Sequence, residues 1–146
     1  MKTIYLKLLA RLKELPQIKY IDRDKGQLEQ YEGDRPPVAF PCILIKQSLP
    51  QCKNLTPKEQ LCSAQITVRV AFDYTGDASS ISGEARLQSA LSYFDTVDAV
   101  LAKLQGWGDA EMNAWERTSQ LEEDRRDNFS VLRITLKTGY RETISS

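Results

Sequence analysis

Apolar residues at the start of the chain recur at intervals of three and four positions, the spacing of one face of an α-helix. This spacing predicts a first helix over residues 3–14, with Thr3 as its N-cap and Pro16 as its stop. A threonine hydroxyl suits the cap because it can accept a hydrogen bond from a free amide of the first turn. The apolar positions are Ile4, Tyr5, Leu8, Leu9, Leu12 and Leu15.

The next apolar runs have the two-residue period of β-strands. Residues 38–46 are apolar on both faces, as expected of a strand covered on both sides. Residues 64–72 alternate apolar and polar, which predicts a half-buried strand with Arg69 on its polar face. Pro41 has no amide hydrogen to donate, so it must lie at a sheet edge, at a bulge or at a strand start. Two weaker strand segments precede this run, at residues 18–22 and 27–31.

The second half of the chain predicts one helix and two strands. A continuous apolar stripe predicts a helix over residues 84–105, capped by Ser82 and ended by Gly106. Strands over 114–121 and 129–138 follow, and the charged turn between them is expected to face solvent. The segments predicted to be loops or tail are residues 47–62, 73–82 and 139–146.

Together these elements predict an α+β fold in a single domain over residues 1–146. Its core is expected to be one mixed or antiparallel sheet of four to five strands, with two main helices packed on one face. The polar tail at 139–146 is expected to fray.

Charge and hydropathy narrow the classes of partner. Twenty Lys and Arg residues balance twenty Asp and Glu residues, so the chain lacks the cationic surplus that nucleic-acid binding normally needs. We therefore expect no direct nucleic-acid ligand, while self-association meets little electrostatic resistance. No apolar run approaches the roughly 20 residues that span a bilayer, so no membrane partner is expected and the protein is expected to be soluble and intracellular.

The chain contains no histidine, which removes histidine general bases, Ser-His and Cys-His pairs and most transition-metal sites. Asp22 and Asp24 resemble the start of a calcium loop, but the glycine that follows comes one position too early. Asp95 and Asp98, three residues apart on the second helix, are typical of a solvated helix face. The sequence therefore indicates no catalytic, cofactor-binding or metal-binding residue.

The three cysteines follow no metal-ligand or disulfide spacing. Cys42 is expected to be a buried strand residue, and Cys52 and Cys62 are expected to be ordinary thiols at the two ends of the 47–62 loop. The sequence leaves the redox state of all three open. Trp107 and Trp115 are interpreted as core or interface anchors because no cationic cluster accompanies them.

The order of elements resembles that of the tail terminator, or tail completion, proteins of long-tailed bacteriophages. The segments that carry the resemblance are residues 4–12, 37–45, 66–73, 87–104 and 129–138. The resemblance implies a prophage-encoded, non-enzymatic assembly protein that forms a ring, typically a hexamer, capping the tail tube and joining it to the head. Its partners would be tail tube and neck proteins, and it would be cytoplasmic during assembly and part of the virion tail afterwards.

Partner contacts are expected at the proline-marked strand and in the two long loops, because long loops in compact domains are usually functional or mobile. Two other functions stay open: a small bacterial adaptor domain without a phage role, and, as a third choice, a carboxylate-dependent enzyme. The candidate oligomer or partner contacts are Pro41, Gln47, Lys53, Asn54, Lys58, Tyr74, Asp77 and Ser79.

Overall fold

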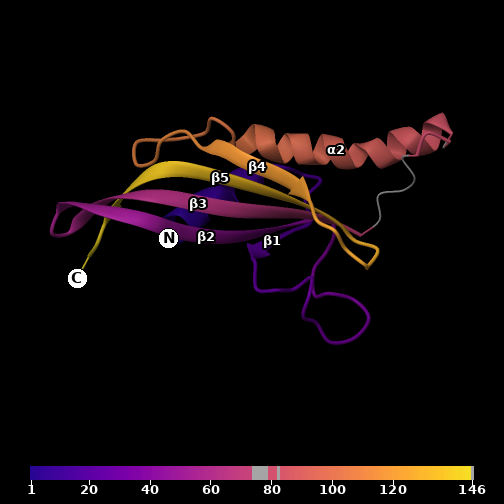
Figure 1. The fold of residues 1–146 in the computed structure, drawn as a ribbon, viewed down its shortest axis with the longest axis horizontal. Helices are drawn as coiled ribbons and strands as arrows, with labels where there is room; N and C mark the ends of the chain where they lie inside the picture. Colours follow the sequence, from indigo (N-terminus) through magenta and orange to yellow (C-terminus); the bar gives the residue numbers. More distant parts are fainter. Residues whose placement is uncertain (74–78, 82, 146) are drawn as a thin grey trace.

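The computed structural model describes residues 1–73, 79–81 and 83–145, and it has the predicted α+β class (Figure 1). Five strands form one sheet in the order β1-β2-β3-β5-β4. β1 runs parallel to β2, and every other pair of neighbours is antiparallel, so the sheet is mixed. The elements are α1 (Lys2–Leu12), β1 (Tyr20–Arg23), β2 (Cys42–Thr56), β3 (Glu59–Phe72), α2 (Glu84–Leu104), β4 (Glu116–Glu122) and β5 (Ser130–Thr143).

Both helices pack on the same face of the sheet. Ile4, Leu8 and Leu12 of α1 join Val97, Val100 and Leu104 of α2 in one buried apolar cluster with the sheet residues below them. The sheet contributes alternate residues of its central strands, as a two-residue period requires. These include Ile43, Ile45, Ile66, Val68, Val70, Ile134 and Leu136.

On the opposite face, the described residues form an apolar cover at one end of the sheet. There a smaller cluster joins Leu28 to Cys42, Leu44, Ala71 and Val131, beneath the connection between β1 and β2. Residues 42–45 are therefore buried on both faces of the sheet, which confirms the prediction from their unbroken apolar run. The strand itself begins at Cys42, later than the predicted start at residue 38.

The predicted loop over residues 47–62 is wrong. β2 continues to Thr56 and β3 begins at Glu59, so these residues form a β-hairpin that we call the arm. Pro50 falls at a register irregularity between Ser48 and Gln51, and Pro57 lies in the turn, so neither proline has to donate a ladder hydrogen bond. The arm lacks apolar alternation because its faces are largely exposed, and this left no strand signal in the sequence.

Other element ends also differ from the prediction. Residues 27–31 form turns and no strand, with the Gln30 amide donating to the Gly26 carbonyl. β4 starts at Glu116, two residues later than predicted. Residues 139–143 do not fray, because β5 runs to Thr143 and pairs with the arm through Gly139↔Ser63 and Tyr140↔Cys62.

The predicted caps of the two helices agree with the structure only in part. α1 begins one residue early, with Met1 as N-cap, so Thr3 lies inside the helix and caps nothing. The predicted cap Ser82 lies outside the described residues, and the N-cap of α2 is Gly83. Gly106 follows the C-cap Gln105 with a φ of 78°, which confirms its predicted role, because this backbone region favours glycine. Across the part of the chain that the structure describes, no helix is long and apolar enough to cross a membrane.

Candidate functional site

The sheet presents two unlike edges. On one side, β1 pairs only with Cys42–Ile45 of β2, so among the described residues no strand covers the outer side of β2 beyond Ile45. On the other side, β4 pairs with β5 alone, and all seven of its residues are exposed. Unpaired backbone amides and carbonyls along such edges can pair with another chain.

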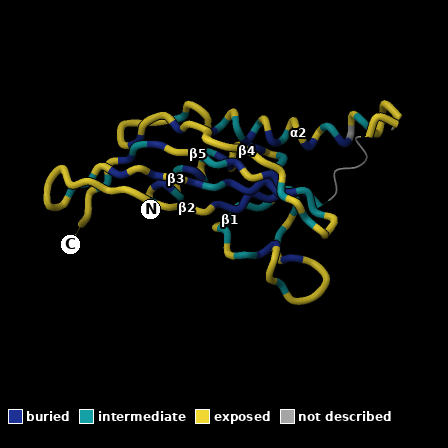
Figure 2. Tube along the Cα trace, viewed as in Figure 1, coloured by how far each residue is buried: buried dark blue, intermediate teal, exposed yellow. Residues whose placement is uncertain are grey.

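The arm extends the first of these edges away from the helices, and its tip is exposed (Figures 1 and 2). Lys53, Asn54 and Lys58 lie there together, and the side-chain amide of Gln60 donates to Asn54 Oδ1 at 2.8 Å. Leu55 and Leu61 add apolar surface, each with 47% of its area exposed. The tip therefore combines two cations, amides and leucines, a mixture suited to a protein partner.

The structure separates the remaining predicted contacts. Gln47 lies at the base of the arm, with its Oε1 buried and without a hydrogen-bond donor among the described residues. Pro41 immediately precedes β2 and is a strand start, and its carbonyl accepts a hydrogen bond from the Lys19 amide at 2.8 Å. β1 therefore already occupies the sheet edge next to Pro41. Ser79 is exposed, and Tyr74 and Asp77 lie outside the described residues.

An ion cluster forms around a buried arginine at the covered end of the sheet. The Arg69 side chain on β3 is only 7% exposed and donates to both carboxylate oxygens of Glu123, each at 2.8 Å. It also donates to both oxygens of Glu29, at 3.0 and 2.8 Å, and to Asp24 at 3.3 Å. Arg125 reinforces the cluster by donating to Glu29 at 2.8 Å and to Glu123 at 3.0 Å. We call these five residues the Arg69 cluster.

The arginines and glutamates of the Arg69 cluster stabilise one another's charged forms. Hydrogen bonds from Arg69 outweigh the opposing effect of burial and lower the pKa of Glu29 to about 2. Burial by itself would raise the pKa of Glu123, but hydrogen bonds from Arg69, Arg133 and Arg125 lower it overall. Burial opposes the charge of Arg69 as well, yet Glu29 and Glu123 raise its pKa. The cluster therefore ties the connection before β2, the centre of the sheet and the β4–β5 turn together.

The predictions for this region hold in part. Arg69 lies on the polar face of β3 as predicted, although acidic side chains cover it. The 122–127 turn was predicted to face solvent, and most of it does, but the side chains of Glu123 and Arg125 are only 10% and 11% exposed. The sequence carries no signal for the cluster, because a charged residue on the polar side of an alternating strand is ordinarily solvated.

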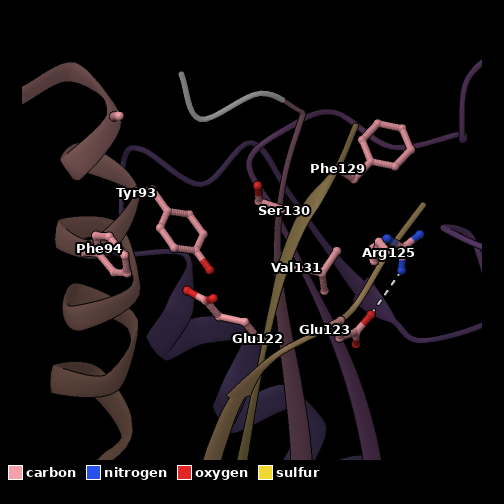
Figure 3. A pocket seen from close by; sticks show the side chains of 9 residues that line it. Tyr93, Phe94, Glu122, Glu123, Arg125, Phe129, Ser130 and Val131 are labelled. Carbon is pink, nitrogen blue, oxygen red and sulfur yellow. Dashed lines mark hydrogen bonds and ion pairs between the residues drawn. The ribbon is translucent and has the colours of Figure 1, made fainter. Parts of the chain in front are cut away.

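A pocket of about 280 Å³ lies beside the cluster, between α2 and the β4–β5 hairpin. Tyr93 and Phe94 line it from α2, Glu122 from the end of β4, and Phe129 from the turn just before β5 (Figure 3). Burial, together with the negative charge of Glu122, raises the pKa of Tyr93 to about 12, so its hydroxyl stays protonated. Phe94 is 44% exposed at the mouth. Sequence reasoning did not identify this pocket, because its walls come from separate elements.

The carboxylates considered for catalysis do not converge. Asp95 and Asp98 are both exposed on α2. Asp22 accepts from the Tyr20 hydroxyl at 2.8 Å and pairs with Lys25 at 3.0 Å. Within the described ranges, no group of three or more Cys, Asp and Glu side chains is placed to hold a metal ion.

The tryptophans have core roles, as predicted. Trp115 is 1% exposed inside the main apolar cluster, and Trp107 packs against that cluster beneath the Arg11 guanidinium, 5.3 Å from the ring centre.

Two of the three cysteines lie in different surroundings from those predicted, because Cys52 and Cys62 belong to paired strands of the arm and not to the ends of a loop. Cys42 is fully buried as predicted, and burial raises its pKa to about 12. Cys52 and Cys62 are directly opposed across the arm, one exposed and the other buried. Burial, followed by a hydrogen bond with the Cys52 thiol, raises the pKa of Cys62 to about 11.

The fold thus defines an α+β protein with one mixed sheet, both helices on one face and a projecting β-hairpin. No family model matches the chain, and no curated protein matches its sequence. A solved structure described as the virion of a native gene transfer agent particle contains a chain with this fold. The two chains superpose with a TM-score of 0.56 over 92% of each, at 9% sequence identity, a likeness of fold.

Proposed function

We propose that this protein is a structural component of a phage-like particle. The observation that carries the proposal is the fold match to a chain of a gene transfer agent virion, which extends over 92% of both chains. The sheet edges and the arm are the surfaces where partners are contacted in this proposal. Its role within the particle is that of a tail terminator: a ring that caps the tail tube and contacts a neck protein on its other face.

The two sheet edges support ring formation. A closed ring needs a head-to-tail contact between two different surfaces of each copy. The outer edge of β2 beyond Ile45 carries Lys46 and Lys53 and no acidic residue, whereas β4 carries Glu116 and Glu122 with Arg117. Opposite net charge favours pairing of one copy's β4 with the next copy's β2 over pairing of like edges. The zero formal net charge of the chain adds little repulsion between copies.

The arm tip supplies the contact with the tail tube in this proposal. Lys53, Asn54 and Lys58 provide polar groups, and Leu55 and Leu61 provide an apolar centre of the kind that is buried in stable interfaces. Gln47, Ser79, Tyr74 and Asp77 remain proposed contacts with the neighbouring copy or the neck protein.

Native mass spectrometry and negative-stain imaging test the ring. We expect a closed oligomer at micromolar concentration, which the double variant Glu116→Lys with Glu122→Lys dissociates by placing like charges on both edges. Adding Lys46→Glu and Lys53→Glu to that variant should restore the ring, because the charges are then exchanged. Reversal of Asp95 and Asp98 on α2 serves as a matched control and should leave assembly unchanged.

A monomer of the unaltered chain that also fails to bind isolated tail tubes would overturn the ring proposal and favour the adaptor alternative.

A further inference from the structure

Cys52 and Cys62 occupy directly opposed positions in the antiparallel arm, one on β2 and the other on β3. Directly opposed residues of antiparallel strands have Cα atoms about 4.5 to 5.5 Å apart. This separation falls within the range of roughly 4.4 to 6.8 Å that a disulfide bond spans. The backbone therefore already holds the two residues at bonding distance.

The side chains are also suitably placed. Directly opposed residues of an antiparallel pair carry their side chains on the same face of the sheet, so the two thiols lie on one face of the hairpin. A register irregularity between Ser48 and Gln51 ends just before Cys52, which leaves that strand room to adjust. Cys42 has no such partner among the described residues and is fully buried.

We propose that Cys52 and Cys62 are a modification site, a dithiol that forms a disulfide bond across the arm when the protein meets a thiol oxidant. The oxidant class is a small-molecule disulfide such as glutathione disulfide. The inference rests on the register and shared face of the two cysteines, and it stands whether or not the protein belongs to a phage-like particle.

The reaction proceeds by two thiol–disulfide exchanges. The exposed Cys52, as thiolate, attacks one sulfur of glutathione disulfide, forms a mixed disulfide and releases one glutathione thiolate. Cys62, as thiolate, then attacks the Cys52 sulfur, forms the Cys52–Cys62 bond and releases the second glutathione. The two cysteines lose two protons and two electrons in total, and the two glutathione molecules leave as thiols.

The disulfide bond would lie in the part of the arm that has the least apolar burial to stabilise it. Gln51–Thr56 of β2 is exposed, so main-chain pairing carries this part of the hairpin with little apolar burial. A covalent link between the strands removes open conformations of the arm without changing its folded shape. Oxidation would thus convert the arm from a hairpin that can open into a fixed one.

The test incubates the full chain, under native conditions, with glutathione disulfide and follows free thiols and intact mass. Of the three thiols, we expect two to disappear, with loss of two hydrogen atoms from the monomer and no retained glutathione. Trypsin should then release the peptides 47–53 and 59–69 as one species that reduction separates. The oxidised protein should also melt several degrees higher and be cut several-fold more slowly after Lys53 and Lys58.

The variant Cys52→Ser changes only an exposed side chain and should abolish the crosslink while leaving the fold unchanged. Three persistent free thiols in the unaltered protein would overturn the proposal. So would a stable glutathione adduct on Cys52 without closure, or a covalent dimer through Cys52.

Discussion

Arg69 shows how far a single side chain can depart from what its position in a sequence indicates. It stands on the polar side of an alternating strand, yet its guanidinium lies among Asp24, Glu29 and Glu123. Both glutamates receive two hydrogen bonds from it, the geometry in which arginine binds carboxylates most strongly. Its burial is tolerated only because these acids neutralise it.

Replacing Arg69 by methionine should therefore be costly. Methionine fills much of the space but leaves Glu123 buried with fewer cationic partners, and we expect a loss of about 3–5 kcal/mol in the free energy of unfolding. Urea denaturation followed by tryptophan fluorescence measures it. Arg133→Met is the matched control, because Arg133 also binds Glu123 at 2.9 Å but is 45% exposed. Its cost should stay within about 1 kcal/mol, and equal losses in the two variants would contradict the assigned role.

At the scale of elements, the sequence predicted those segments whose burial follows a simple period. The helix near residues 84–105, the strand over 64–72 and the doubly buried residues 42–45 all appeared from apolar spacing alone. The arm did not, because its strands are exposed on their faces and carry two prolines, which together look like a loop. The Arg69 cluster was equally hidden, since its acids lie 40 to 54 residues away along the chain.

The connection between α2 and β4 is tightly folded, and this packing leads to a testable prediction. It folds back on itself, with the Gly106 amide donating to the Trp115 carbonyl and the Trp115 amide donating to the Trp107 carbonyl, both at 2.8 Å. A Cβ atom on Gly108 would lie 2.8 Å from the backbone of Asn113 and Ala114. Rigid backbone atoms cannot yield as a flexible side chain can.

Gly108→Ala should therefore destabilise the fold by about 1–3 kcal/mol, as overpacking does. Thermal melting compared with Ala110→Ser measures the effect, because Ala110 is exposed in the same connection and its substitution should change stability by no more than about 0.5 kcal/mol. An unchanged melting midpoint for Gly108→Ala would show that this connection is looser than described.

For the whole molecule, the order of strands in the sheet determines which strands resist local unfolding most strongly. β3 is paired along its length with β2 on one side and β5 on the other, and its inner half is buried. β4 pairs on one side only and is exposed throughout. Opening the sheet from the outside should therefore release β4 well before β3.

Hydrogen exchange followed by mass spectrometry tests this order. We expect the slowest exchange at residues 64–72 and their partners in β5, and exchange at Glu116–Glu122 faster by orders of magnitude in the isolated protein. If a ring forms through β4, its amides should gain protection on assembly while those of β3 stay unchanged. Equal exchange rates for β3 and β4 in the monomer would contradict the assigned stability order.

The position of β5 also determines when the sheet can be completed during synthesis of the chain. β5 comes last of the five strands along the chain, yet it lies inside the sheet between β3 and β4. While the ribosome is still making Ser130–Thr143, β3 has no neighbour on that side, and the β4–β5 pairing that places Glu123 beside Arg69 cannot yet form. Until β5 has been synthesised, the nascent protein therefore exposes an apolar strand edge that other chains could bind. Chaperone binding would be most useful during this interval.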